Sequence, residues 1–212
     1  SGDGGDELFA GYETNIADQI HRSFSPLIPS GIMKGLSSGL PYIMPPSFKK
    51  VSFGEKLTRL VNGLSFEFPV AHASWRMIFS PEEKKALCPA LTQEECLAPL
   101  HDQGRFMEDV SIAHPIDQAS YVDLKTWMVD DILVKVDRAS MAHALEVRAP
   151  YLDHRVVEFA AQLPVDFKLK RLQKKYILKN TLEKYLPKSI LYGKKRGFNA
   201  PISHWFLQDK GA

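Results

Sequence analysis

The chain has 212 residues, of which 44% are hydrophobic and 10% aromatic, and its 27 Lys and Arg nearly balance its 25 Asp and Glu. This composition excludes a disordered, collagen-like or low-complexity chain, because it supplies enough apolar side chains to bury a core. No run of about 18 apolar residues occurs, so we expect no membrane-spanning helix. No secretory signal is visible, and Cys88 and Cys96 lack metal-ligand spacing, so we expect reduced thiols and a cytoplasmic location.

The chain opens on an acidic, glycine-rich stretch, Ser-Gly-Asp-Gly-Gly-Asp-Glu, and not on Met. Such a stretch usually follows a strand and opens a helix, so we expect the sequence to be a piece of a longer protein. The two glycines between Asp3 and Asp6 let the backbone fold tightly around a bound group. Such an arrangement can hold Mg²⁺ with one carboxylate and direct the second carboxylate at a substrate. A plain turn also explains this stretch.

The next hundred residues contain local signals for loops and helices. Residues 23–50 are rich in Pro and Gly and predict a loop with short helical turns. Apolar residues then recur at helical spacing between 53 and 64. Ser80 and Thr92 each precede a Glu three residues later, which predicts two capping boxes that open short helices.

The second half of the chain also reads as helical. Apolar residues recur from 116 to 144 and cover almost every face between Trp127 and Val136, which predicts a helix buried in the middle of the domain. Asp153 is the expected N-cap of a helix that stops at Pro164, and a further amphipathic helix is expected from about 173 to 186. No alternating strand pattern of five residues appears, so the expected fold class is mainly α.

Charged residues gather in two places. Between Lys168 and Arg196 eleven Lys and Arg accompany one acid, a formal charge of +10, so the rest of the chain carries −8. This basic stretch suits a polyanion such as phosphate, although a solvated helix face gives the same pattern. Charges are also interspersed through residues 130–153, where they form internal ion pairs such as Glu146 with Arg148 or Asp137 with Arg138, or face a cleft.

Four stretches, taken together and in this order, resemble one family. They are Ser-Gly-Asp-Gly-Gly-Asp-Glu-Leu-Phe-Ala-Gly-Tyr (1–12), Val-Asp-Arg-Ala-Ser-Met-Ala leading into Leu-Glu-Val-Arg-Ala-Pro-Tyr-Leu-Asp (136–153), Lys-Lys-Tyr-Ile-Leu-Lys (174–179) and Lys-Arg-Gly-Phe (195–198). The chain resembles the glutamine-dependent asparagine synthetase family over residues 1 to about 205.

The resemblance implies a fold and a division of the chain. It implies the helical C-terminal portion of an α/β synthetase domain of the adenine-nucleotide alpha-hydrolase-like (PP-loop ATPase) type, with the nucleotide-binding sheet largely missing. Residues 1–12 would form the Mg²⁺–pyrophosphate and acyl-adenylate loop, 116–164 the central buried helices and 168–205 a basic helix and loop. The family's Ser-Gly-Gly-x-Asp-Ser nucleotide loop does not occur here, so we expect the isolated chain to be inactive.

The activity implied is ATP-dependent amidation of aspartate through an aspartyl-adenylate. Ammonia comes in that family from an N-terminal glutaminase domain, which is also missing here. Asp6 matches a Mg²⁺ ligand, Lys175 matches the lysine that stabilises pyrophosphate, and Asp3 stands where many members have a Glu that acts as general base. Ser1, Gly2 and Gly4 match residues that line the adenylate side of the cleft.

Alternatives remain at this stage. Relatives with these motifs amidate sugars or peptides or close β-lactam rings, so another acid could replace aspartate. A non-catalytic helical module that binds a polyanion is the other class, but aromatic residues do not alternate with the cations as nucleic-acid stacking would require. We therefore expect ATP and aspartate as small-molecule substrates, no nucleic acid and no membrane, and leave a homodimer open.

Overall fold

The computed structural model describes residues 1–24, 53–107, 111–112 and 114–193, together with positions 27, 32, 35 and 39. Helices dominate this part of the chain, and its only strands are two residues long, β1 (Leu169–Lys170) and β2 (Gln173–Lys174), paired antiparallel. The expected mainly α fold is therefore confirmed for the described residues. The loop expected at 23–50 and the basic loop at 195–198 lie almost wholly outside them.

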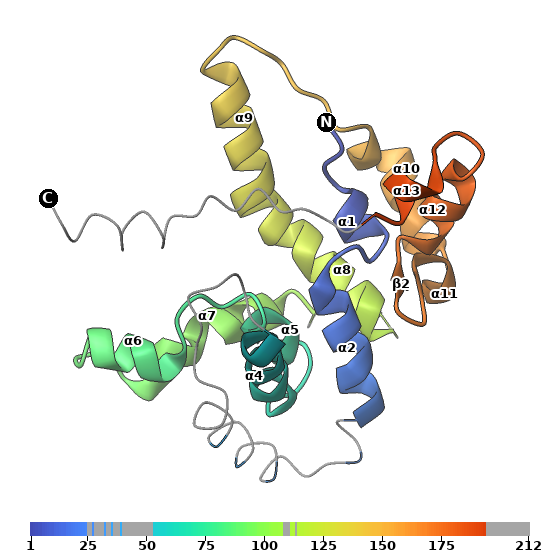
Figure 1. Cartoon of the computed structure of the whole chain (residues 1–212). Helices are drawn as coiled ribbons and strands as arrows, with labels where there is room; N and C mark the ends of the chain where they lie inside the picture. The colour runs from blue at the N-terminus through green and yellow to red at the C-terminus, as the bar shows by residue number, and fades with distance from the viewer. Residues whose placement is uncertain are drawn as a thin grey trace, which may run out of the picture.

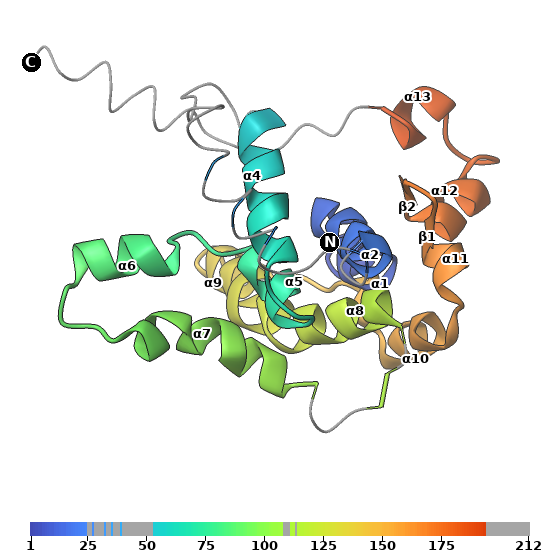
Figure 2. The same ribbon diagram turned by 90° about the horizontal axis from the view of Figure 1, so that it is seen from below.

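Three helices occupy the middle of the molecule and separate two groups of elements (Figures 1 and 2). They are α1 (Gly5–Leu8), α2 (Glu13–Phe24) and α8 (Pro115–Lys125). On one side lie α4 (Phe53–Leu64), α5 (Val70–Ser74), α6 (Pro81–Leu87) and α7 (Gln93–Arg105). On the other lie η3 (Pro150–Leu152), α10 (His154–Gln162), α11 (Val165–Lys168), the two strands, α12 (Tyr176–Leu182) and α13 (Lys188–Leu191).

The predicted helix starts are confirmed where a side chain caps the backbone. Ser80 accepts from the backbone N–H of Glu83, whose carboxylate accepts from the N–H of Ser80, and Thr92 and Glu95 form the same capping box before α7. The Asp153 carboxylate accepts from the N–H of Arg155 at the start of α10. These local signals need no tertiary contact, which explains why the sequence predicts them well.

The core forms directly behind the acidic glycine loop. Leu8 and Phe9 are buried against Ala160 of α10, and Ala10 is buried against Ile116 of α8 and Leu169. Burial of such side chains contributes about 1.5–3 kcal/mol each for the larger ones. Residues 8–10 therefore anchor the loop that precedes them against α8 and against the group of elements that contains α10 and β1.

The helix expected over 116–144 is interrupted and is not buried as a whole. After α8 the chain forms a π-helix, η2 (Met128–Leu133), and then α9 (Val134–Met141), in which no residue is buried. Val129 is 49% exposed, Val134 38% and Met141 53%. Figure 1 shows α9 projecting away from the other described elements, so its apolar side chains have nothing to pack against on most sides. The burial predicted between Trp127 and Val136 is therefore wrong, because Met128 alone is buried in η2 and no residue is buried in α9. The role of residues 116–164 as the central part of the domain stays a prediction.

The helix expected from about 173 to 186 is shorter. Gln173 and Lys174 belong to β2, and Lys175 has left-handed dihedral angles, φ 54° and ψ 40°, so that α12 begins only at Tyr176. The helix ends at Leu182, before the turn that leads to Pro187. The side chain of Lys175 therefore leaves the backbone ahead of the helix and not from one of its faces.

None of the helices in the described part of the chain combines the length and the apolar character that crossing a bilayer needs.

Candidate functional site

The acidic glycine loop turns sharply at Gly4. This residue has φ 91°, in the left-handed region that favours glycine, and it precedes α1. A Cβ atom at Gly4 would lie 2.5 Å from Cδ2 of Leu152. The loop can therefore approach η3 this closely only with glycine at that position. Gly2, by contrast, is exposed and has open space where a Cβ would stand.

Asp6 and Lys175 form an ion pair. The Lys175 Nζ lies 3.0 Å from Oδ1 of Asp6, and both side chains are partly buried. Gly11 lies against this pair: its N–H donates to the Asp6 carbonyl over 2.8 Å, and a Cβ there would be 2.0 Å from Asp6 Oδ1 and 2.4 Å from Lys175 Cε. The structure thus brings together the two residues for which the sequence suggested a phosphate and metal role, and Gly11 leaves the space for their contact.

The backbone fixes Lys175 in this position. Its N–H donates to the carbonyl of Phe9 over 3.1 Å, which ties the start of α12 to the buried end of the acidic loop. Neighbouring lysines add positive charge: Lys174 pairs with Glu13, and Lys179 stacks over Tyr192 at 5.4 Å. Partial burial, followed by the charges of Lys174 and Lys175, lowers the pKa of Lys179. This concentration of cations is suited to an anion.

A separate cleft of about 450 Å³ lies at the N-terminal end of the loop. Ser1 and Asp3 line it, and the Ser1 hydroxyl donates to Asp3 Oδ2. Neither Gly2 nor Gly4 is among its lining residues, and neither is the Asp6–Lys175 pair. The opposite walls come from η2, α9 and the segment before α10: Leu133, Val136, Val147, Arg148, Ala149, Pro150, Leu152 and Asp153.

The charged residues around that cleft are exposed or half-buried. Arg148 pairs with Glu146, as the sequence suggested, but this ion pair stands at the surface and is not internal. Asp153 accepts two hydrogen bonds of 2.9 Å from Arg155, and these, with the backbone N–H of Arg155, lower the pKa of Asp153 to about 2. An Asp137–Arg138 ion pair is not among those that the described residues form.

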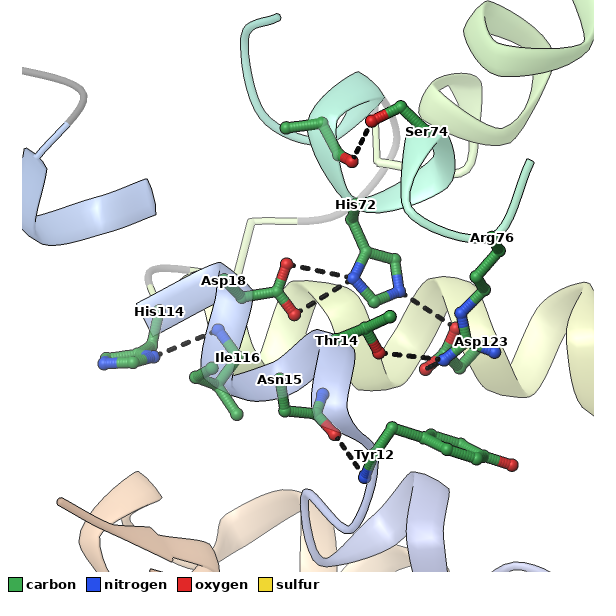
Figure 3. A network of polar contacts seen from close by, with 11 residues as sticks. Tyr12, Thr14, Asn15, Asp18, His72, Ser74, Arg76, His114, Ile116 and Asp123 are labelled. Atoms are coloured by element: carbon green, nitrogen blue, oxygen red, sulfur yellow. Dashed lines mark hydrogen bonds and ion pairs between the residues drawn. The ribbon is translucent and has the colours of Figure 1, made fainter. Parts of the chain in front are cut away.

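A buried chain of charged residues lies behind the loop (Figure 3). His72 of α5 is 1% exposed, and its Nδ1 lies 3.0 Å from both carboxylate oxygens of Asp18. Its Nε2 lies 3.0 Å from Oδ1 of Asp123, whose Oδ2 accepts from Nη2 of Arg76 over 2.5 Å. Three elements, α2, α5 and α8, are joined by this chain of ionic hydrogen bonds.

The electrostatics of this cluster are close to balanced. Burial alone would lower the pKa of His72, but the charge of Asp18 and the hydrogen bonds that the ring donates to both carboxylates raise it to about 9. Burial raises the pKa of Asp18. With His72 and Arg76 charged, two cations compensate the carboxylates of Asp18 and Asp123, as buried charges require.

The cluster reaches the acidic loop through Tyr12. The guanidinium of Arg76 lies 4.6 Å from the ring centroid of Tyr12 and 5.1 Å from that of Trp127. The Tyr12 hydroxyl donates to Glu7, which is 3% exposed and whose pKa is raised by burial. Sequence reasoning missed this cluster, because Asp18, His72 and Asp123 are far apart in the chain and follow no motif.

The described residues contain no group of three or more His, Cys, Asp or Glu side chains that could hold a metal ion by themselves. Mg²⁺ in proteins is often held by one or two carboxylates together with substrate phosphates. Asp6 beside Lys175 fits that pattern as a single carboxylate next to a cation that can bind phosphate.

Comparisons with known proteins point to one family. The family model described as asparagine synthase matches residues 1–211. Asparagine synthetase [glutamine-hydrolyzing] 1 of Bacillus subtilis is 34% identical over 213 residues, which covers 99% of this chain and 31% of that protein. Asparagine synthetase [glutamine-hydrolyzing] 3 of the same organism is 44% identical over 85 residues, 40% of this chain and 14% of that protein.

A more distant relative carries another name. Amidase chyE of Penicillium rubens is 31% identical over 110 residues, 48% of this chain and 16% of that protein. No solved structure matches the chain. The chain spans about a third of the length of the first Bacillus subtilis relative.

Proposed function

This chain belongs to the asparagine synthase family, and on that premise we propose that it forms the helical part of an ATP-dependent amidoligase that converts aspartate to asparagine. The carboxylate of the acid attacks the α-phosphorus of ATP, and pyrophosphate leaves as the Pα–O–Pβ bond breaks. Ammonia, released from glutamine elsewhere in the whole protein, then attacks the acyl carbon, AMP leaves, and the nitrogen loses a proton.

The Asp6–Lys175 ion pair is the observation that carries this proposal. Breaking a phosphoanhydride adds negative charge to the leaving pyrophosphate, and an ammonium group held in place stabilises that charge more than it stabilises ATP. Lys175 is held at both ends, by its N–H bond to Phe9 and by the contact with Asp6. Lys174 and Lys179 add cationic charge near the same anion.

Asp6 is the residue of this chain that would hold Mg²⁺. When bound, the ion would neutralise negative charge on the phosphates. Asp6 itself has two tasks in the proposal: it supplies one oxygen ligand, and its negative charge keeps Lys175 oriented before ATP arrives. Gly11 permits both, because any Cβ at that position would displace the Asp6 carboxylate.

The cleft beside Ser1 and Asp3 is proposed as the acyl and adenylate side of the site. Asp3 lies in its wall, and the Ser1 hydroxyl orients one carboxylate oxygen. A carboxylate near the acyl carbon can accept the proton that the attacking nitrogen loses. Gly2 and Gly4 serve by their backbone, and Gly4 in particular lets the loop turn against Leu152.

Isotope transfer tests the proposed reaction directly in the whole protein that contains this chain. Aspartate labelled with ¹⁸O in its β-carboxylate is incubated with ATP, Mg²⁺ and glutamine, and the products are analysed by mass spectrometry. An adenylate route transfers one ¹⁸O to AMP and yields asparagine. Label in inorganic phosphate, with ADP as product, would contradict adenylation. If AMP formed with a sugar, a peptide or a β-amino acid but not with aspartate, the chain would belong to a related amidoligase. No turnover with any acid would favour the non-catalytic module.

A further inference from the structure

We infer that Arg76 is a positioning residue for the Asp6–Lys175 site, acting through Tyr12 and Glu7 from the buried cluster of Asp18, His72, Asp123 and Arg76. The inference rests on the proposed function for the role of that site, but its structural part stands on contacts alone. Arg76 follows α5 and is distant in sequence from every residue it would position.

The contacts form a continuous path. Arg76 Nη2 donates to Asp123 and also lies 3.5 Å from the Thr14 hydroxyl, so the guanidinium is held by α8 and by the start of α2. The guanidinium also lies over two aromatic rings, 4.6 Å from the centroid of Tyr12 and 5.1 Å from that of Trp127, and Tyr12 is the one that leads to the acidic glycine loop. A cation over the face of an aromatic ring is attracted by the negative charge of that face, so Arg76 holds the Tyr12 ring in place.

Tyr12 contacts the acidic glycine loop on both sides of Asp6. Its hydroxyl donates to Glu7, the residue after Asp6 in α1. Its backbone N–H donates to the buried side chain of Asn15 over 3.0 Å, which fixes the peptide that follows Gly11. Asp6 is therefore held on one side by Glu7 and on the other by Gly11, whose N–H binds the Asp6 carbonyl.

The cluster behind Arg76 is rigid for a physical reason. Asp18, His72 and Asp123 are each 1% exposed or less, so none of their charges is stabilised by solvent. Among the described residues, Asp18 pairs with His72, and Asp123 pairs with both His72 and Arg76. A displacement of Arg76 would therefore leave the Asp123 carboxylate with one cation fewer. Arg76 is consequently a fixed support against which the Tyr12 ring can be placed.

If Arg76 only stabilised the fold, its loss would raise local opening throughout the protein. If it positions the acidic glycine loop, its loss raises opening mainly in that loop. Two amides report on the loop: the N–H of Gly11, bound to the Asp6 carbonyl, and the N–H of Lys175, bound to the Phe9 carbonyl. The N–H of Cys96, bound to the Thr92 carbonyl in α7, serves as a reference outside it. Their exchange with solvent measures local opening without any need for activity.

The experiment compares Arg76→Met and Arg76→Lys with Arg105→Met in the whole protein. Arg105 is an exposed residue of α7 paired with Asp102, so its replacement removes the same charge outside the cluster. In Arg76→Met we expect the Gly11 and Lys175 amides to exchange at least about tenfold faster, the ratio that one lost charge-assisted hydrogen bond produces. The Cys96 amide should change less than about twofold, Arg76→Lys should lie between, and Arg105→Met should match the wild type.

Kinetics separate positioning from substrate binding. In ATP–pyrophosphate exchange, Arg76→Met should lower kcat by about tenfold or more while KM for aspartate stays within about threefold, because misplacement of Lys175 affects the transition state most. If the wild type has no exchange activity, the proposed function fails, and the amide result still decides the positioning role.

Two results would overturn the inference. One is unchanged exchange at Gly11 and Lys175 in a folded Arg76→Met protein, and the other is equal acceleration of all three amides. Should Arg76→Met fail to fold, Tyr12→Phe decides instead, because it keeps the ring beneath Arg76 and removes only the hydroxyl that binds Glu7. That variant should raise the exchange rate of the Gly11 amide several-fold. An exchange rate equal to that of the wild type would contradict a path through Tyr12 and Glu7.

Discussion

The carboxylate of Asp6 lies 3.0 Å from the ammonium of Lys175, although the two residues come from opposite ends of the described chain. The contact depends on a third position, Gly11, where a side chain would occupy the same space. It also depends on the left-handed conformation of Lys175, which releases the side chain before α12 begins. The Asp6–Lys175 ion pair thus requires both a glycine at position 11 and the left-handed backbone of Lys175.

Replacement of Gly11 should disturb that pair and the fold around it. The Cβ of Gly11→Ala would lie 2.0 Å from Asp6 Oδ1, so the carboxylate or the backbone must move. Overpacking of this kind costs about 1–3 kcal/mol of unfolding free energy, measured by urea denaturation. Gly2→Ala is the matched control, since open space surrounds that position, and its cost should stay below about 0.5 kcal/mol. Equal stability of the two variants would contradict the packing argument.

The buried cluster predicts that stability falls in mildly alkaline solution. The pKa of His72 is raised to about 9 in the folded chain from the ordinary value of 6.5. The folded state therefore binds this proton more tightly than the unfolded one, so the stabilisation is fully present below pH 6.5 and is lost as the pH rises through 9. The loss should reach about 3 kcal/mol, measured as unfolding free energy between pH 6 and 10.

His72→Gln should remove this pH dependence, because the amide does not titrate. A wild type whose stability is constant or rises between pH 6.5 and 9 would contradict the charged state of His72. NMR of the imidazole in the folded protein checks the same point independently, and the ring should be protonated on both nitrogens at pH 7.5.

The basic stretch should divide into buried and solvated lysines. Lys168 is 2% exposed and its Nζ lies 2.7 Å from Asp117 Oδ1, so Lys168→Ala leaves a partly buried carboxylate without its cation. We expect a cost of about 3 kcal/mol in unfolding free energy. Lys188, exposed at the start of α13, is the control, and Lys188→Ala should change stability by less than about 0.5 kcal/mol. Similar small costs for both would show that the Lys168 pair is weak.

Asp3 should act after adenylation and not during it. In the whole protein, Asp3→Asn is expected to leave aspartyl-adenylate formation largely intact and to slow its capture by ammonia by about 10²–10⁴-fold, the usual contribution of a general base. Higher pH should partly restore capture, because less of the ammonia pool is then protonated. Rapid-quench measurement of the adenylate tests this. Loss of adenylate formation that excess Mg²⁺ restores would instead make Asp3 a metal ligand.

Local signals in the sequence predicted more of this structure than long-range ones did. The capping boxes at Ser80 and Thr92 and the cap at Asp153 depend on residues three positions apart or fewer, and the structure confirms them. The helix expected from 173 failed because nothing in the residue types around Lys175 signals its positive φ. The prediction that α9 is buried was wrong. Apolar residues on every face of a helix favour burial, but the helix sequence does not show whether other elements pack around it.

The roles assigned to the site residues stay predictions, and the structure shows only how their side chains lie. Motif resemblance proposed Asp6 and Lys175 as site residues, and their side chains form an ion pair in the structure, whereas Gly11 and Arg76 were not singled out. The roles of a glycine that leaves space and of an arginine that supports a tyrosine ring follow from three-dimensional contacts. Asp18, His72 and Asp123 likewise become a cluster only when α2, α5 and α8 pack together.

The most direct test of the central claim is ATP–pyrophosphate exchange, dependent on aspartate and Mg²⁺, in the whole protein carrying Lys175→Met. Loss of one electrostatic contact to the leaving group should lower kcat by about 10²–10³-fold, with KM for aspartate within about threefold. Lys184→Met, which removes an exposed lysine beyond α12, should retain wild-type exchange. Near-normal exchange in Lys175→Met, in a protein with unchanged unfolding free energy, would contradict the assignment of the Asp6–Lys175 pair to pyrophosphate departure.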